Sequence, residues 1–280
     1  MKPAPFRYER PRDVIEVLDL LAEHGGEAKV LAGGQSLVPM MNFRLARPEV
    51  LIDIGAVSGL DQVLSDDRRV TMGTRVRHVE LEHPPFGGPL GSLLADAARH
   101  VGHLPIRLRG TFGGSIAHAD PAAEWCLLAQ TLGADMTVTS VRGRRVVPAE
   151  EFFRSAFVTS MADDELLTEV RLPWLDHNWT TGFSEFSRRA GDFAVVAVAT
   201  AVKMGSGLIV EARIGAAGVG PTPVRLANAE AALVDQPLSP ESIAAASEMA
   251  GQEVDPRGDI HGSADYRRDL VRALTRRALR

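Results

Sequence analysis

The sequence predicts an α+β fold in two parts, and three observations support this prediction. The chain has 280 residues with 45% hydrophobic and 24% charged content, which is ordinary for a globular protein of about two domains. The last third places strand patterns before helical patterns, the order that is typical of an α+β domain. Hydrophobic periodicity breaks at residues 173–181, where we place the boundary between the two parts.

The elements of the first part follow from hydrophobic periodicity and from the residues that interrupt it. The first helix carries Val14, Leu18 and Leu21 on one stripe and ends at Gly25. An irregular loop over residues 107–121 is expected before a helix that has Pro121 in its first turn. The predicted helices span 13–23, 90–101 and 121–132, and the predicted strands span 29–31, 50–54, 69–73, 136–141, 144–147 and 166–172.

The second part is predicted to be a three-stranded antiparallel sheet followed by helices. The last helix has an apolar stripe that ends at Leu274 and Ala278. A neighbouring face carries Arg268, Arg272 and Arg276, and is either a contact surface for a partner or a solvated face. The predicted strands span 182–187, 194–203 and 208–214, and the predicted helices span 224–234, 240–250 and 264–280.

Charge and hydropathy argue against two classes of partner. The net charge is -5 and no run of Lys and Arg forms a nucleic-acid-binding arm. The longest apolar run, residues 194–202, is far shorter than the roughly 20 residues of a membrane helix. The N-terminus lacks the apolar segment of a secretory signal. We expect a cytoplasmic protein without a transmembrane segment, with a peripheral position at the inner membrane face as the alternative.

The chain has 1 cysteine, Cys126. An internal disulfide is therefore impossible, and so is an iron–sulfur cluster held by this chain alone, since such a cluster takes about four thiolates. Cys126 lies between Trp125 and Leu127 in a helical pattern. We expect a buried small hydrophobe rather than a nucleophile.

Two glycine-rich segments, residues 32–37 and 110–115, are the strongest candidates for a ligand site. Each pairs two glycines with neighbouring hydroxyl side chains such as Ser36 and Ser115. Paired glycines let backbone N–H groups approach a ligand, and successive amides form an anion-binding nest. Each segment alone is more often a plain turn, whereas the pair suggests a clamp on a diphosphate from two sides.

Other motifs that carry chemistry are absent. There is no G-x-G-x-x-G after a strand, no G-x-x-x-x-G-K-[ST], no H-E-x-x-H and no C-x-x-C. His100 and His103 are close in sequence, but Gly102 breaks the helix that would align them. We therefore assign no metal site and no catalytic residue. His118 and Asp120 either contact a ligand, or His118 forms a hydrogen bond within its own loop.

The two glycine-rich segments and their flanks resemble the flavoprotein (medium) subunit of carbon monoxide dehydrogenase and related molybdenum hydroxylases, which include xanthine dehydrogenase. The resemblance extends over nearly the whole chain. The residues that carry it are Ala32–Met41 with Leu51–Ile54, Arg109–Ala122, Gly191–Ala194 and Ala264–Arg268.

The resemblance implies a fold and a domain division. Residues 1–176 would form a vanillyl-alcohol-oxidase (PCMH)-type FAD-binding domain with subdomains of about 1–56 and 57–176. Residues 177–280 would form an α+β domain, like the C-terminal domain of the carbon monoxide dehydrogenase flavoprotein, that closes over the flavin.

The resemblance also implies an FAD site. The diphosphate would lie between the two glycine-rich segments, and Phe112 would lie near the isoalloxazine. Glu124 and Glu185 stand where the family usually has Asp and often has Lys. The implied cofactor-binding residues are Lys29, Val30, Leu31, Ala32, Gly33, Gly34, Gln35, Ser36, Leu37, Val101, His103, Gly110, Thr111, Phe112, Gly113, Gly114, Ser115, His118, Asp120, Glu124, Leu167 and Glu185.

In related enzymes, a molybdenum-cofactor large subunit oxidises the substrate and a small subunit carries two [2Fe–2S] clusters. Electrons then reach FAD and leave to a quinone or NAD. The resemblance implies the same partners here, in a dimer of heterotrimers. Two alternatives remain open: a stand-alone FAD-dependent oxidase or dehydrogenase, and a nucleotide-binding module without redox turnover.

Overall fold

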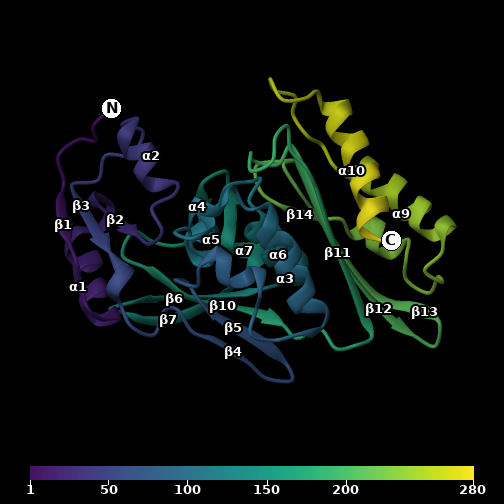
Figure 1. Cartoon of the computed structure of the whole chain (residues 1–280), viewed down its shortest axis with the longest axis horizontal. Coiled ribbons are helices and arrows are strands. Elements are labelled where there is room, and N and C mark those ends of the chain that lie inside the picture. Colours follow the sequence, from purple (N-terminus) through teal and green to yellow (C-terminus); the bar gives the residue numbers. More distant parts are fainter.

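The computed structural model describes residues 1–280 and builds them around three main sheets (Figure 1). The first is a parallel sheet of three strands in the order β1-β3-β2. Asp13 caps the first helix by accepting a hydrogen bond from Glu16 N at 3.0 Å. The elements of this unit are β1 (Arg7–Glu9), α1 (Val14–His24), β2 (Ala28–Leu31), α2 (Leu37–Asn42) and β3 (Val50–Asp53).

The second sheet is antiparallel, with five strands in the order β4-β5-β10-β6-β7. Its helices contribute to the largest hydrophobic cluster, of 37 buried residues, with Trp125 fully buried. The elements are β4 (Val63–Ser65), β5 (Arg69–Gly73), α3 (Gly88–His100), α4 (Leu104–Arg107), α5 (Phe112–His118), α6 (Glu124–Leu132), β6 (Asp135–Ser140), β7 (Gly143–Pro148), α7 (Ala149–Phe152), the small pair β8 (Phe153–Ser155) and β9 (Val158–Thr159), and β10 (Leu166–Pro173).

The third sheet is antiparallel, with four strands in the order β11-β12-β13-β14. In Figure 1, α9 and α10 lie on its outer side, and α3 and α6 lie between it and the rest of the molecule. The elements are β11 (Trp179–Phe186), β12 (Val196–Gly205), β13 (Leu208–Ala217), β14 (Val224–Arg225), α8 (Ala227–Ala231), α9 (Pro240–Glu253) and α10 (Ala264–Ala278).

Strand β12 is buried on both faces, which explains its unbroken apolar sequence. Ala197, Ala199 and Ala201 belong to the large cluster that contains the residues of α3 and α6. Val196 and Val198, which point the other way, belong to the cluster formed with α9 and α10. The small alanine side chains let the sheet approach α6 closely, so one continuous core joins the two parts of the chain.

Three predictions of secondary structure are wrong. The segment 107–121 is not an irregular loop, because it contains the end of α4 and all of α5. The next helix begins at Glu124 rather than at Pro121. The predicted helix over 224–234 is a fourth strand, β14, followed by the short α8, so the last sheet has four strands and not three.

The arginine face of α10 is occupied within the chain. Arg272 forms ion pairs with Glu248 of α9 at 3.1 Å and with Asp269 at 2.8 Å. Arg268 pairs with Asp255 at 3.0 Å, and Arg276 lies 3.6 Å from Glu248. These side chains tie α10 to α9 and its C-terminal extension, which gives the face a role inside the fold.

The close contact between β11 and the end of α10 yields a stability prediction. A Cβ at Gly182 would overlap the carbonyl oxygen of Ala278 and lie 2.8 Å from its carbonyl carbon. We expect Gly182→Ala to lower the free energy of unfolding by about 1–3 kcal/mol through this overlap, as measured by urea denaturation. Gly220→Ala, whose Cβ meets nothing closer than 3.7 Å, is the matched control and should stay within about 0.5 kcal/mol of wild type.

Candidate functional site

The first glycine-rich segment presents a row of unused hydrogen-bond donors. None of the backbone N–H groups from Gly33 to Leu37 donates a hydrogen bond within the chain. Gly34 has a φ of 72°, and the Gln35 side chain donates to Gly33 O at 3.0 Å, which shapes the turn. Buried or half-buried amides need acceptors, and successive free amides form a nest for an anion. This segment therefore fits a phosphate group.

The two glycine-rich segments touch, although they are far apart in the sequence. A Cβ at Gly33 would overlap Arg109 O and lie 2.6 Å from Gly110 Cα. The Arg77 guanidinium donates to the same Arg109 carbonyl. A Cβ at Gly114 would lie 3.8 Å from that of Ala32. Gly33 is needed for this close approach and not for a left-handed backbone, since its φ is not positive.

The second segment leads into the first turn of α5, and the amides of Phe112 to Ser115 are already satisfied. Thr111 caps the helix by accepting from Gly114 N at 3.1 Å. Phe112 N donates to Val76 O at 2.8 Å, and Gly113 N donates to Thr74 O at 3.1 Å. This segment therefore acts mainly as a rigid wall for the first, and offers the Ser115 hydroxyl, which makes no hydrogen bond within the chain.

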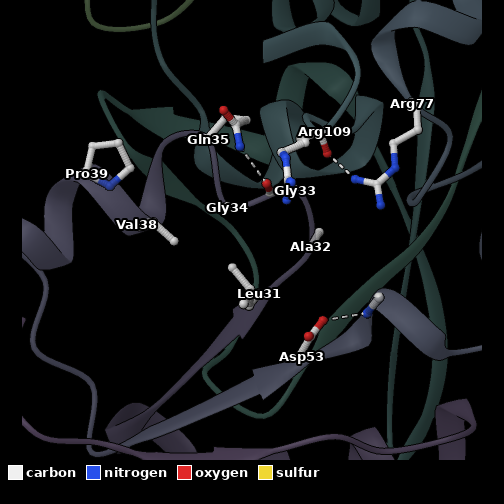
Figure 2. A pocket seen from close by; sticks show the side chains of 11 residues that line it. Leu31, Ala32, Gly33, Gly34, Gln35, Val38, Pro39, Asp53, Arg77 and Arg109 are labelled. Carbon is white, nitrogen blue, oxygen red and sulfur yellow. Dashed lines mark hydrogen bonds between the residues drawn. The ribbon is translucent and has the colours of Figure 1, made fainter. Parts of the chain in front are cut away.

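An open cleft of ≈ 520 Å³ lies against the first segment (Figure 2). Asp53, at the carboxyl end of β3, accepts hydrogen bonds from Gly55 N at 2.7 Å and from the Tyr8 hydroxyl. The cleft is lined by Leu31, Ala32, Gly33, Gly34, Gln35, Val38, Pro39, Asp53, Gly55, Arg77 and Arg109, and by no residue from 110 to 115.

Sequence reasoning missed Asp53, Arg77 and Arg109 as neighbours of the site. Asp53 carried a usable signal, because it lies near the carboxyl end of the strand predicted over 50–54, and ligands gather at the carboxyl ends of parallel strands. There was no comparable sequence signal for Arg77 and Arg109, since an isolated arginine in a loop is usually a solvated side chain.

Several predicted site residues do not line the cleft, and some of them have buried side chains. Phe112 is 1% exposed and packs edge-on against Trp125, with ring centroids 5.4 Å apart, so its side chain does not line the cleft. Val101 and Leu167 are also in the large cluster. His103 precedes α4 and lies against Gly191 of the second part of the chain. Lys29 is exposed, and Val30 is half-buried on β2.

The contacts of His118 bear on its two predicted roles, which were a ligand contact and a hydrogen bond within its own loop. His118 ends α5 and packs against Phe157, with ring centroids 5.0 Å apart. It makes no hydrogen bond with its loop, and burial lowers its pKa. Asp120 accepts from Ala122 N at 2.9 Å, which holds the turn before α6. The half-buried His118 ring therefore packs as an aromatic group against Phe157.

Glu124 and Glu185 are two buried acids near the junction between the two parts of the chain. Glu124 begins α6 and is 8% exposed, and burial raises its pKa to about 7. The Glu185 side chain on β11 is 2% exposed, its Oε2 has no hydrogen-bond partner, and His100 Nδ1 lies 4.0 Å from its Oε1. Burial raises the pKa of Glu185 to about 8, and the Glu124 charge adds to this.

Two other buried polar groups are structural. The prediction that Cys126 is a buried small hydrophobe is confirmed, since it is 0% exposed, its Sγ lies 3.5 Å from Ser115 O, and burial raises its pKa well above the usual value. His78 accepts a hydrogen bond from Trp125 Nε1 at 2.9 Å, and burial lowers the pKa of His78 to about 3.

No group of three or more His, Cys, Asp and Glu side chains is arranged to hold a metal ion.

Comparisons with known families identify the ligand that this geometry suits. Residues 4–175 match the family described as the FAD binding domain in molybdopterin dehydrogenase, and residues 181–280 match the CO dehydrogenase flavoprotein C-terminal domain. The chain belongs to the FAD-binding subunits of the molybdopterin dehydrogenases. It is thus an oxidoreductase subunit that binds FAD, with a PCMH-type FAD-binding domain and a C-terminal α+β domain, as the resemblance implied.

Relatives match over the full length. The alpha subunit of the 6-hydroxypseudooxynicotine dehydrogenase complex of Paenarthrobacter nicotinovorans is 42% identical, with 100% of this chain and 95% of that protein covered. The carbon monoxide dehydrogenase medium chain of Hydrogenophaga pseudoflava is 32% identical, with 100% and 97% covered. Among solved structures, quinoline 2-oxidoreductase from Pseudomonas putida 86 superposes with a TM-score of 0.93 at 36% identity, with 100% and 97% covered.

The contact between Gly33 and Arg109 predicts the effect of a single methyl group. Gly33→Ala would push the first segment away from the backbone of the second and misplace its free amides, so we expect FAD affinity to fall by at least about tenfold. Quenching of flavin fluorescence on titration of the apoprotein measures this. Gly87→Ala, whose Cβ meets nothing within 4 Å, is the control. Unchanged affinity in Gly33→Ala would show that this contact does not shape the site.

The buried glutamates predict how stability depends on pH. Burial raises both pKa values above the ordinary glutamate value, so the unfolded chain loses these protons first and folding is opposed as pH rises. We expect the apoprotein's free energy of unfolding to fall between pH values of about 5 and 8. Glu185→Gln should reduce this fall by on the order of 1 kcal/mol, whereas the exposed Glu150→Gln should follow wild type. Parallel profiles for all three proteins would contradict the assignment.

Proposed function

We propose that this chain is the electron-transfer subunit of a molybdenum hydroxylase complex. It takes electrons from [2Fe–2S] clusters of a small partner subunit and passes them to an external acceptor, a quinone or NAD. A large subunit with the molybdenum cofactor carries out substrate oxidation, and the assembly is a dimer of heterotrimers in the cytoplasm. No helix is long and apolar enough to cross a membrane, so a location at the inner membrane face would be peripheral.

One observation carries the placement of the cofactor: the five consecutive amides from Gly33 to Leu37 that have no acceptor in the chain. A diphosphate supplies oxygens for such donors, and amides in a row bind it without a cationic side chain. The Ser115 hydroxyl on the adjoining wall supplies a further donor. We propose that the other predicted contact residues border the part of FAD beyond its diphosphate. These residues are Lys29 to Ala32, His103, His118 and Asp120.

The remaining chemistry must be supplied by FAD and by other chains. When bound, FAD supplies both one-electron and two-electron redox chemistry. The residues of this chain hold it and exclude water. They do not hold clusters, because 1 cysteine cannot provide about four thiolates. We propose that residues 1–176, with subdomains 1–56 and 57–176, bind FAD and that residues 177–280 cover it.

The substrate belongs to the large subunit in this proposal. Relatives are named for nicotine and caffeine, which are nitrogen heterocycles, and for carbon monoxide, a diatomic gas, so the substrate varies widely among related chains. A stand-alone oxidase would need its own substrate site with a catalytic base. The strongly perturbed acids here are Glu124 and Glu185, which lie in the junction between the two parts of the chain and not in the cleft.

Co-expression with a molybdenum-cofactor large subunit and a [2Fe–2S] small subunit tests the proposal. We expect a stable heteromer in which added substrate reduces the flavin. The chain alone should bind FAD but should not be reduced by substrate, because it holds neither clusters nor molybdenum. Omission of the small subunit from the co-expression is the control and should abolish reduction of the flavin by substrate. Metal-free turnover of a substrate by this chain alone would favour the stand-alone oxidase instead.

A further inference from the structure

The cleft beside the first glycine-rich segment is lined by two arginines that have no acidic partner (Figure 2). The Arg77 guanidinium donates to the carbonyl oxygen of Arg109, and the Arg109 guanidinium forms no hydrogen bond or ion pair within the chain. By contrast, the nearby Arg75 lies 3.6 Å from Asp61. Because two guanidiniums in one cleft repel each other, this arrangement favours an anion between them.

The Arg77 side chain is half-buried and held in one direction. Its guanidinium binds the Arg109 carbonyl, and its backbone N donates to Glu80 Oε1 at 2.8 Å. Burial and the charges of Arg75 and Arg109 lower the pKa of Arg77. The carboxylates of Glu80 and Asp53 act in the opposite direction. A bound anion would offset the repulsion among the arginines and accept the remaining N–H groups of Arg77.

Asp53 is the one acidic side chain in the cleft lining, and its oxygens are already engaged. Oδ1 accepts from Gly55 N at 2.7 Å, and Oδ2 accepts from the Tyr8 hydroxyl. Asp53 forms no ion pair with Arg77 or Arg109, and Figure 2 shows it apart from both guanidiniums. The lining therefore keeps an excess of positive charge, although the whole chain has a net charge of -5.

The wall of the cleft adds backbone donors to the two guanidiniums. Residues 32–35 line it, and the amides from Gly33 onward have no acceptor in the chain. Guanidiniums bind phosphate oxygens through paired N–H groups, and rows of amides bind the same oxygens. A diphosphate offers one charged group to each guanidinium, and a cleft of ≈ 520 Å³ has the size of a small-molecule site. This chemistry fits a diphosphate and not a neutral ligand.

We propose that Arg77 and Arg109 form a diphosphate-binding pair, with one guanidinium on each phosphate group. Neither residue is among the cofactor contacts that the family resemblance implies. The diphosphate has two possible sources: FAD, or a free nucleotide bound beside it. The cleft admits the second source because no residue from 110 to 115 lines it, so it is not the gap between the two glycine-rich segments. The inference rests on the proposed function only where the diphosphate belongs to FAD.

Calorimetric titration of the FAD-free protein with inorganic pyrophosphate tests the pair. We expect wild type to bind, and Arg77→Gln and Arg109→Gln each to bind at least about tenfold more weakly, because each loses a charge-assisted contact. Added salt should weaken binding more steeply in wild type than in either variant. Arg109→Lys, which keeps the charge but loses the planar fork, should fall between wild type and Arg109→Gln.

Two features of the design separate ligand binding from folding. Arg109→Gln changes an exposed side chain and keeps the backbone carbonyl that Arg77 binds, so its fold should be unaffected. Arg154→Gln removes another exposed arginine, one outside the cleft lining, and is the matched control that should follow wild type.

The same titration of the FAD-loaded protein identifies the source of the diphosphate. If it belongs to FAD, bound FAD should exclude pyrophosphate, and FAD affinity should fall at least about tenfold in Arg77→Gln and Arg109→Gln. If it belongs to a free nucleotide, pyrophosphate should bind the FAD-loaded and FAD-free proteins alike, and FAD affinity should not change in the variants. Either result supports the pair.

Equal pyrophosphate affinity in wild type, Arg77→Gln and Arg109→Gln would overturn the pair, and so would absence of pyrophosphate binding in wild type. These outcomes leave the proposed function intact. The proposed function fails separately, if substrate does not reduce the flavin in the complex with both partner subunits.

Discussion

The fold depends on one strand being buried on both sides. β12 presents alanines to α6 and α3 and valines to α9 and α10, so neither part of the chain can complete its core without the other. Because sheet and helix meet through small side chains, their separation is fixed by backbone contact and not by flexible side chains. α6, which Glu124 begins, is held in place by its packing against β12 and β13.

A second close approach sets the other end of the site. Gly33 lies against the backbone carbonyl of Arg109, and the Arg77 guanidinium donates a hydrogen bond to the same carbonyl. The wall is rigid because each amide at the start of α5 already has an acceptor, whereas the amides opposite have none. One segment therefore supplies structure and the other supplies donors. Their sequences look alike, each with paired glycines and hydroxyls, yet the structure gives them different roles.

The sequence was most informative where local periodicity decides structure. β5 was predicted at its observed bounds, and the ends of α1 and α3 were predicted to within a few residues, since capping and glycine breaks are local signals. α5 was missed because two glycines lower helix propensity, and tertiary contacts of Gly113 and Thr111 override it. β14 was missed because two residues carry no strand pattern. The FAD family came from specific residues, but the free amides and the unpartnered Glu185 oxygen could not be read without coordinates.

The burial of Cys126 has a practical consequence. The only thiol of the chain lies at 0% exposure on α6, with its sulfur beside the Ser115 carbonyl of α5. A thiol reagent can reach it only when these two helices separate, and its raised pKa slows reaction further. The rate at which a thiol reagent labels Cys126 therefore measures local opening of the region that adjoins the cofactor, and this measurement needs no engineered probe. Cys126 therefore reports how strongly a bound flavin or a docked subunit suppresses the separation of α5 and α6.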